Sequence, residues 1–213
     1  MGRENSILPS PKTTPLRALD SVSRILKPPG MKQLVILAAM LPALVLPVRS
    51  AEPVTATFYI TDVKCGSCAS SIEDSVRKLP TVTKIESLGD NTGFALITFD
   101  PKVVSYHQVA QAVFAAAPVH GDPYVATLKF TIPDYAKGDN AAKVDAIFAR
   151  HKKNVQVELK NKERGKFLLH FEPLTVSSAA KGPQGWNLDQ FISAIQEPAP
   201  KGLGLAFEVA SEK

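Results

Sequence analysis

Two stretches of the chain share one pattern, Gly93-Phe-Ala-Leu-Ile-Thr-Phe-Asp-Pro101 and Gly165-Lys-Phe-Leu-Leu-His-Phe-Glu-Pro173, at a constant offset of 72 residues. Each is a short apolar run between a glycine and a proline, which is typical of a buried strand. Flanking segments also match: Thr57–Thr61 with Thr127–Thr131 upstream, and Tyr106–Val113 with Leu188–Ile195 downstream. The chain therefore contains two copies of one unit of about 70–80 residues.

Each copy predicts the same order of elements: strand, helix, strand, strand, helix, strand. In the first copy these are a strand at 54–61, an amphipathic helix through Ile72 and Val76 that Pro80 ends, strands at 82–87 and 93–99, a helix through Tyr106 and Val113, and a strand at 124–131. In the second copy they are a helix at 141–150, a hairpin at 155–160 and 166–172, a helix at 187–196 and an alternating strand at 203–209.

This order is the split βαβ motif. The predicted fold class is therefore α+β, with tandem ferredoxin-like (βαββαβ) units whose antiparallel sheets carry helices on one face. Residues 124–131 are the only strand available both to end the first unit and to begin the second. In this motif the last strand lies at an edge and the first is central. We expect the strand either to serve the second unit alone or to be shared by the two sheets.

A long apolar run, Leu34–Val48, precedes the two units. Met31-Lys32 lies just before it and small residues lie near its end at Ser50, which is the layout of a secretory signal. Pro42 and Pro47 interrupt the run, whereas a membrane-spanning helix needs roughly 20 apolar residues. We expect export with cleavage near Ser50 to a periplasmic or extracellular location, without a stable membrane span. An uncleaved anchor is the alternative.

The predicted division of the chain is thus a disordered or untranslated extension at 1–30, a signal peptide at 31–50, and units at 51–120 and 121–213. Translation begins at Met1 or at Met31. Of the 25 basic and 20 acidic residues, residues 1–50 hold seven and two, so residues 51–213 hold 18 of each. Because the net charge of +5 belongs to the leader, the body of the protein offers no basic surface excess for a nucleic-acid partner.

One cluster in the body has ligand chemistry, Cys65-Gly66-Ser67-Cys68. It lies between the first strand and the first helix, so Cys68 is placed at a helix N-terminus. There the unpaired N–H groups, together with the nearby Lys64, favour a thiolate. Two thiolates without further ligands suit Cu(I), and Hg(II) by the same chemistry, whereas structural zinc prefers four ligands. We expect Cu(I), with Hg(II) or Zn(II) as alternatives.

Residues 54–118 resemble the heavy-metal-associated (HMA) domain of copper chaperones, copper-ATPase amino-terminal modules and periplasmic mercury-binding proteins. The resemblance rests on the first strand, Cys65–Cys68, Ser71-Ile72-Glu73, Leu79–Val82 and Gly93–Pro101. It implies a ferredoxin-like fold with Cys65 and Cys68 as metal ligands. The family usually has methionine two positions before the first cysteine, where this chain has Val63. We expect a looser loop around an intact site.

Three residues are candidates for a supporting shell: Lys64, Ser67 and His120. In a ferredoxin-like unit the loop after the second helix approaches the loop after the first strand. His120 would then donate a hydrogen bond or serve as a weak third ligand. The sequence favours a surface histidine without a role over either of these. In the second unit the corresponding loop, Tyr135–Gly138, has no sulfur or imidazole, so we expect a metal-free copy.

We expect a protein that captures a soft metal ion and hands it to a metal-accepting partner protein, or receives the ion from a donor. No Ser-His-Asp order, phosphate loop or paired carboxylates suggest an enzyme. Two alternatives use the same residues differently. One is a thiol-disulfide redox protein, against which no tryptophan precedes Cys65 and a hairpin follows the helix. The other is a structural or interaction module in which the cysteine pair is inert.

Overall fold

The computed structural model of the chain describes residues 52–89 and 92–212. The predicted extension at 1–30 and the predicted signal peptide at 31–50 lie outside these residues, as do Asp90 and Asn91 in the first hairpin turn. Within the described ranges, no helix has both the length and the apolar character that crossing a membrane requires.

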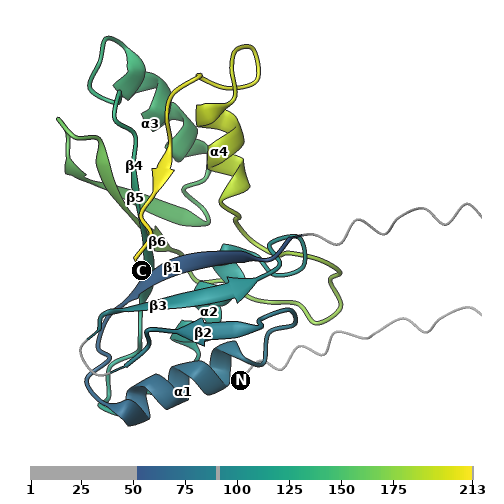
Figure 1. Cartoon of the computed structure of the whole chain (residues 1–213). Coiled ribbons are helices and arrows are strands. Elements are labelled where there is room, and N and C mark those ends of the chain that lie inside the picture. Colours follow the sequence, from purple (N-terminus) through teal and green to yellow (C-terminus); the bar gives the residue numbers. More distant parts are fainter. Residues whose placement is uncertain (1–51, 90–91, 213) are drawn as a thin grey trace, which may run out of the picture. The chain divides into compact units, whose positions relative to one another are not determined.

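The described residues form an α+β fold with four helices and an antiparallel sheet, as predicted. The elements in chain order are β1 Val54–Ile60, α1 Gly66–Val76, β2 Lys84–Glu86, β3 Phe94–Phe99, α2 Tyr106–Phe114, β4 Ala126–Thr131, α3 Asn140–Arg150, β5 Val155–Asn161, β6 Lys166–Phe171, α4 Asp189–Gln196 and β7 Glu208–Val209 (Figure 1). Helix α1 buries one apolar stripe and β3 buries every second residue, as the periodicities in the sequence predict.

All seven strands lie in one sheet in the order β2-β3-β1-β4-β6-β5, with β7 paired to β4. The predicted separate sheets are thus continuous through β4, which is shared. One edge of β4 pairs with β6 over Thr127–Thr131. The other edge is divided, with β1 at Ala126 and Thr127 and β7 at Phe130 and Thr131. Strand β4 can belong to both units because β1 and β7 pair with different parts of the same edge. Figure 1 shows β7, in yellow, beside β4.

The 72-residue offset recurs in the backbone. The N–H of Ile60 donates to the carbonyl of Gly93 at 3.0 Å, and the N–H of Ile132 donates to the carbonyl of Gly165 at 2.8 Å. Both glycines have positive φ, 68° and 56°, a conformation that costs a side-chain-bearing residue about 1–2 kcal/mol. The two hairpins therefore begin their second strands in the same way.

The predicted strand at 203–209 is wrong over most of its length, because only Glu208 and Val209 pair as strand. The N–H groups of Leu203, Gly204 and Leu205 donate instead to the carbonyls of Ala194, Glu197 and Ile195. The last carbonyls of a helix have no partner within the helix. This segment therefore caps α4, and its apolar alternation serves packing rather than a sheet ladder.

The core is continuous from the first unit to the second. Phe58 on β1 lies 6.4 Å from Phe171 on β6, between ring centroids, and Phe171 lies 6.0 Å from Trp186. Trp186 in turn packs edge-on against Phe191 of α4 at 4.9 Å. Aromatic pairs at such separations add to the stabilisation from burial. The two sequence repeats thus share a core as well as a strand.

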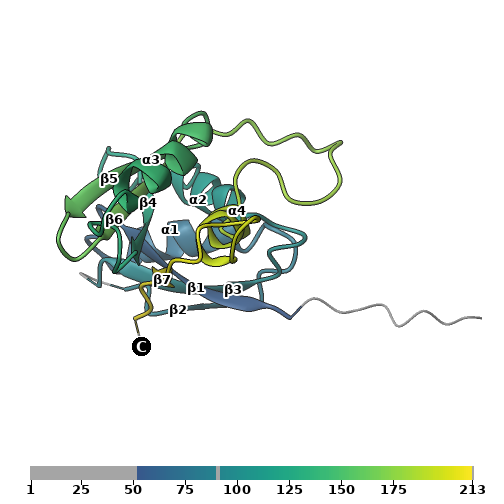
Figure 2. The same ribbon diagram turned by 90° about the horizontal axis from the view of Figure 1, so that it is seen from above.

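A long segment, residues 172–188, connects β6 to α4 (Figure 2). It contacts the N-terminal end of α2, where the N–H of His107 donates to the carbonyl of Trp186 at 3.3 Å. His107 of α2 is buried against it and uses both ring nitrogens. Its Nε2–H donates to the carbonyl of Glu172 at 2.6 Å, and its Nδ1 accepts the N–H of Trp186 at 3.2 Å. Burial lowers the pKa of His107, although the bond to the Glu172 carbonyl opposes this. The folded protein therefore holds a neutral histidine at this junction.

Acid is expected to weaken the fold through His107. The unfolded chain takes up a proton near the ordinary histidine pKa of about 6.5, whereas the folded chain resists it. Stability is therefore complete above that pH and falls as the pH drops toward the lower folded pKa. His107→Gln, which keeps a donor and an acceptor but does not titrate, should show a smaller loss. Urea unfolding at pH 7.5 and 5.5, followed by the fluorescence of the one tryptophan, measures this; equal losses in both proteins would refute it.

Candidate metal centre

The two cysteines lie where β1 passes into α1. Cys65 is the N-cap of α1, with extended backbone, and its Sγ accepts the N–H of Cys68 at 3.4 Å. Cys68 lies in the first helical turn, as predicted, among unpaired N–H groups. Val63 is 6% exposed and belongs to the core, so it fills the apolar position where the HMA family usually has methionine.

Three ligand atoms converge at this point. The Sγ atoms of Cys65 and Cys68 are 3.2 Å apart, and Nε2 of His120 lies 3.4 Å from Sγ of Cys65. All three atoms lie within 4.8 Å of one another. Cys68 is fully buried, Cys65 is half-buried and His120 is exposed. Exposure to solvent therefore increases from the sulfur of Cys68, through that of Cys65, to the imidazole of His120.

His120 reaches the cysteines because the loop between α2 and β4 is bound to α1. The hydroxyl of Ser71 donates to the carbonyl of Ala117 at 2.7 Å. At the other end of the loop the N–H of Val119 donates to the hydroxyl of Tyr124 at 3.1 Å, and Tyr124 is buried. Sequence reasoning did not assign a role to Ser71 or Tyr124. Ser71 follows Cys68 by three residues, so helical periodicity could have placed it on the same face.

The environment of Cys68 favours its thiolate. Burial by itself raises the pKa of Cys68, but hydrogen bonds from the hydroxyl of Tyr124, from Cys65 and from backbone N–H groups outweigh it. Together they lower the pKa of Cys68 to about 6. A thiolate is the form that binds metal or attacks a disulfide. At neutral pH the site therefore presents one ionised sulfur before any ion arrives.

The thiolate absorbance of the reduced protein at 240 nm is expected to rise with a midpoint near pH 6 that Cys68→Ser removes. Tyr124→Phe should move this midpoint upward, because the thiolate loses a hydrogen-bond donor while the thiol form loses little. In the metal-free protein the same shift makes folding more favourable above the ordinary thiol pKa, and this gain is lost as the pH falls through 6. A Cys68 midpoint near 8.5 in the wild type would contradict the expectation.

Lys64 and Ser67, the other predicted supporting residues, are chain neighbours of the cysteines, and a hydrogen bond from the Lys64 backbone is one of those that lower the pKa of Cys68. The ammonium of Lys64 pairs with Asp62 at 3.3 Å, and both side chains are only partly exposed. Ser67 is exposed, and no side-chain hydrogen bond of Ser67 is found among the described residues. In the second unit Tyr135 is buried, and its hydroxyl donates to Asp145 at 3.0 Å. That loop thus contributes to the core instead of a ligand set.

The donor set suits a soft ion. Two thiolates and an imidazole are ligands for Cu(I) and other thiophilic metals. A metal–thiolate bond of about 2.3 Å with trigonal angles places two sulfurs about 4 Å apart. The sulfurs at 3.2 Å would therefore separate by less than an ångström, which the N-terminal turn of a helix permits. The residues fit a bound ion with only local adjustment.

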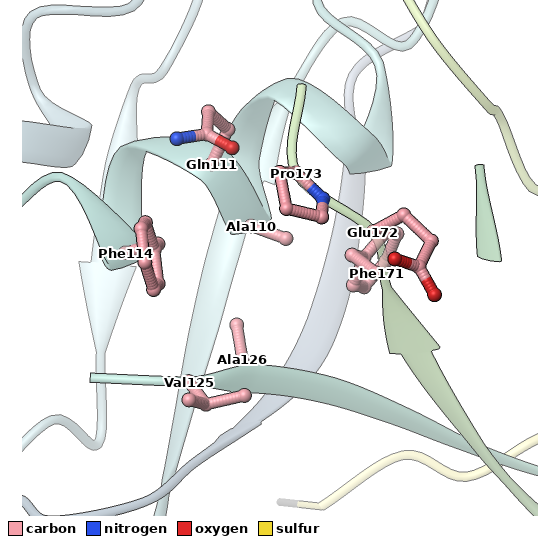
Figure 3. Close-up of a pocket in the computed structure, with 8 residues that line it drawn as sticks. All are labelled: Ala110, Gln111, Phe114, Val125, Ala126, Phe171, Glu172 and Pro173. Carbon is pink, nitrogen blue, oxygen red and sulfur yellow. The ribbon is translucent and has the colours of Figure 1, made fainter. Parts of the chain in front are cut away.

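A separate pocket of about 140 Å³ lies between α2, β4 and the end of β6 (Figure 3). Sites for small organic ligands usually enclose about 300–1,000 Å³. Its walls are mostly apolar, and the amide oxygen of Gln111 already accepts the N–H of Leu174 at 3.0 Å. Its lining consists of Ala110, Gln111, Phe114, Val125, Ala126, Phe171, Glu172 and Pro173. The pocket is too small and too poor in polar groups for a substrate site.

No family model and no curated protein sequence matches this chain. Among solved structures, it is similar to the water-soluble region of the P-type ATPase CopA from Bacillus subtilis, at 16% identity and a TM-score of 0.33 over 75% of this chain and 93% of that one. The N-terminal soluble domains of B. subtilis CopA match at 16% identity and a TM-score of 0.31, over 61% and 85%. Similarity at this level establishes neither a common function nor a family.

Proposed function

We propose that this chain binds one soft heavy-metal ion, Cu(I) foremost, through Cys65 and Cys68 with His120 as a third ligand. The convergence of these three ligand atoms within 4.8 Å supports the proposal most directly. The lowered pKa of Cys68 adds a ready thiolate. The sequence resemblance of residues 54–118 to HMA domains points to the same two cysteines.

The graded exposure of the site favours hand-over to a partner protein rather than permanent storage. Cys68 anchors the ion from the buried side, while Cys65 and His120 face solvent. A partner's thiolate approaches from that side and bonds to the ion as one of these ligands leaves. No electrons move, so the reaction is ligand exchange and the protein is not an enzyme. The apolar run at Leu34–Val48 supports export, and we place this exchange outside the cytoplasm.

The two sequence repeats are, on this proposal, ferredoxin-like units of which only the first binds metal. The hydrogen bonds of Gly93 and Gly165, each of which joins a hairpin to the end of the unit's first strand, support a common origin of the units. The second unit supplies β6 and the segment 172–188, which cover β4 and α2. Its role is to complete the fold around the metal-binding unit.

Cu(I) titration against a chromophoric chelator, with both thiols kept reduced, tests the proposal. We expect one ion per chain, held tightly enough to compete with the chelator. Failure to bind while both thiols are shown to be free would refute metal binding. Parallel titrations with Hg(II) and Zn(II) establish the selectivity, for which the two-sulfur, one-nitrogen donor set favours the softer ions.

A thiol-disulfide function is the second candidate, and the separation of 3.2 Å between the two sulfurs supports it. A disulfide would form when an external oxidant, such as a partner's disulfide, takes up the two electrons and the thiol protons leave, with the sulfurs approaching to about 2.05 Å. The lowered pKa of Cys68 would also suit an attacking thiolate. The reduction potential of the pair distinguishes the two: a value near those of dedicated oxidants, about −120 to −180 mV, would favour redox exchange over metal transfer.

A further inference from the structure

We infer that Ser71 and Tyr124 are positioning residues that hold the loop 117–123 against α1 and thereby set the coordination number of the metal site. With both hydrogen bonds made, His120 completes a site of two sulfurs and one nitrogen. With either bond lost, His120 moves away and two sulfurs remain. This inference rests on the proposed function. It means that two residues that do not bind the ion themselves control how many ligands the ion has.

Loop 117–123 has little else to fix its position. It lies between the last turn of α2 and β4, and among the described residues its backbone makes no hydrogen bond to another backbone group. All of its residues are exposed, and Gly121 has a positive φ of 94°. The hydroxyl of Ser71 holds its first residue, Ala117, and the hydroxyl of Tyr124 holds Val119, next to His120.

The anchor at Ser71 ties His120 to the same rigid element as the cysteines. Ser71 lies on α1, one turn beyond Cys68, and Cys65 is the N-cap of that helix. Tyr124 is 1% exposed, so its ring is held by the core and its hydroxyl is a fixed acceptor for the N–H of Val119. Two bonds from fixed elements thus determine where an otherwise exposed histidine lies.

The chain offers a matched control for each anchor. Ser75 lies one turn beyond Ser71 on α1, and its hydroxyl makes the same kind of bond, to the carbonyl of Ala112 at 2.6 Å. That carbonyl belongs to α2 and not to the loop. Tyr135 is a second buried tyrosine, with its hydroxyl bonded to Asp145 at 3.0 Å, in the unit without cysteines. Ser75→Ala therefore removes an equivalent bond, and Tyr135→Phe removes the hydroxyl of another buried tyrosine, in both cases without releasing His120. Because the Tyr124 hydroxyl also bonds to Cys68, the imidazole signal, and not the affinity, reports the position of the loop.

X-ray absorption of the Cu(I)-loaded full-length chain tests the inference, because imidazole scattering reports the bound histidine directly. We expect two sulfurs and one imidazole nitrogen in the wild type. Ser71→Ala and Tyr124→Phe should lose the imidazole signal and resemble His120→Ala, with a Cu(I) affinity about 10-fold lower. Ser75→Ala and Tyr135→Phe should match the wild type, and Ser71→Thr, which keeps the hydroxyl, should restore the signal. Tryptophan fluorescence verifies that each variant is folded.

The outcomes separate this inference from the function on which it rests. A wild type that binds one Cu(I) with two sulfurs and no imidazole overturns the inference and leaves metal binding intact. Retention of the imidazole in either Ser71→Ala or Tyr124→Phe overturns the inference that both bonds are needed to hold His120. Loss of the signal in Ser75→Ala as well would also overturn it, since any weakening of α1 would then suffice. A wild type that binds no Cu(I) overturns the proposed function itself.

Discussion

Replacement of both cysteines, Cys65→Ser/Cys68→Ser, is expected to weaken Cu(I) binding roughly 10⁴-fold. Structural sites with four ligands bind zinc with about 10–16 kcal/mol, or roughly 3 kcal/mol per ligand, and the loss of two ligands scales accordingly. A serine hydroxyl is not ionised at neutral pH and is a hard donor, so it does not substitute for a thiolate on a soft ion. Competition with a chromophoric chelator measures the change.

The fold should tolerate Cys65→Ser by itself. A loss of metal binding in this single variant would therefore reflect the missing ligand and not unfolding. Cys65 is the N-cap of α1 and accepts the N–H of Cys68. Serine is among the preferred N-cap residues, so Cys65→Ser should lose metal without losing stability. Cys68 is fully buried, and its replacement should also cost some stability. Tight Cu(I) binding by the folded double variant would exclude the two sulfurs as ligands.

Gly165→Ala is expected to lower the free energy of unfolding by about 3–5 kcal/mol. Gly165 has a φ of +56°, and an added Cβ would lie 1.9 Å from the carbonyl oxygen of Ile132. The N–H of Ile132 also donates to the Gly165 carbonyl, so relief of the clash breaks this bond. The substitution therefore adds a steric conflict to the strain of a left-handed alanine.

Gly93→Ala is the matched control, because Gly93 is the equivalent residue 72 positions earlier. Its φ is +68°, but an added Cβ would meet no atom of the described residues within 4 Å. Only the conformational strain remains, and it costs about 1–2 kcal/mol. Urea unfolding of the two variants compares the loss of stability caused by strain and steric conflict together, in Gly165→Ala, with the loss caused by strain alone, in Gly93→Ala. Equal losses would mean that the contact with Ile132 relaxes freely and that the hairpin of the second unit is less constrained than its geometry implies.

Much of the candidate site could be predicted from local sequence. The spacing of Cys65 and Cys68 and their place between a strand and a helix required Cys68 to lie in the first turn, and it does. The predicted order of elements brings the loop that contains His120 toward the cysteines, but it does not place the His120 side chain beside Cys65. The hydrogen bonds that Ser71 and Tyr124 make to this loop could not be predicted, because a serine on a helix and a tyrosine before a strand occur in many other roles. Their partners, Ala117 and Val119, are backbone groups and carry no signal in sequence.

The sequence by itself determined the type and order of the helices and strands, the repeat, and the pair of cysteines at the start of the first helix. These depend on apolar periodicity, turn residues and spacing, all of which act within a few residues along the chain. Only the tertiary structure decided that β4 is shared in one sheet, that residues 203–205 cap α4, and that His120 lies beside Cys65. Each of these is a choice of partner for backbone or side-chain groups far apart in the chain. A buried polar group pairs with a donor or acceptor that the packing of the core places within bonding distance, and the local sequence does not identify that partner.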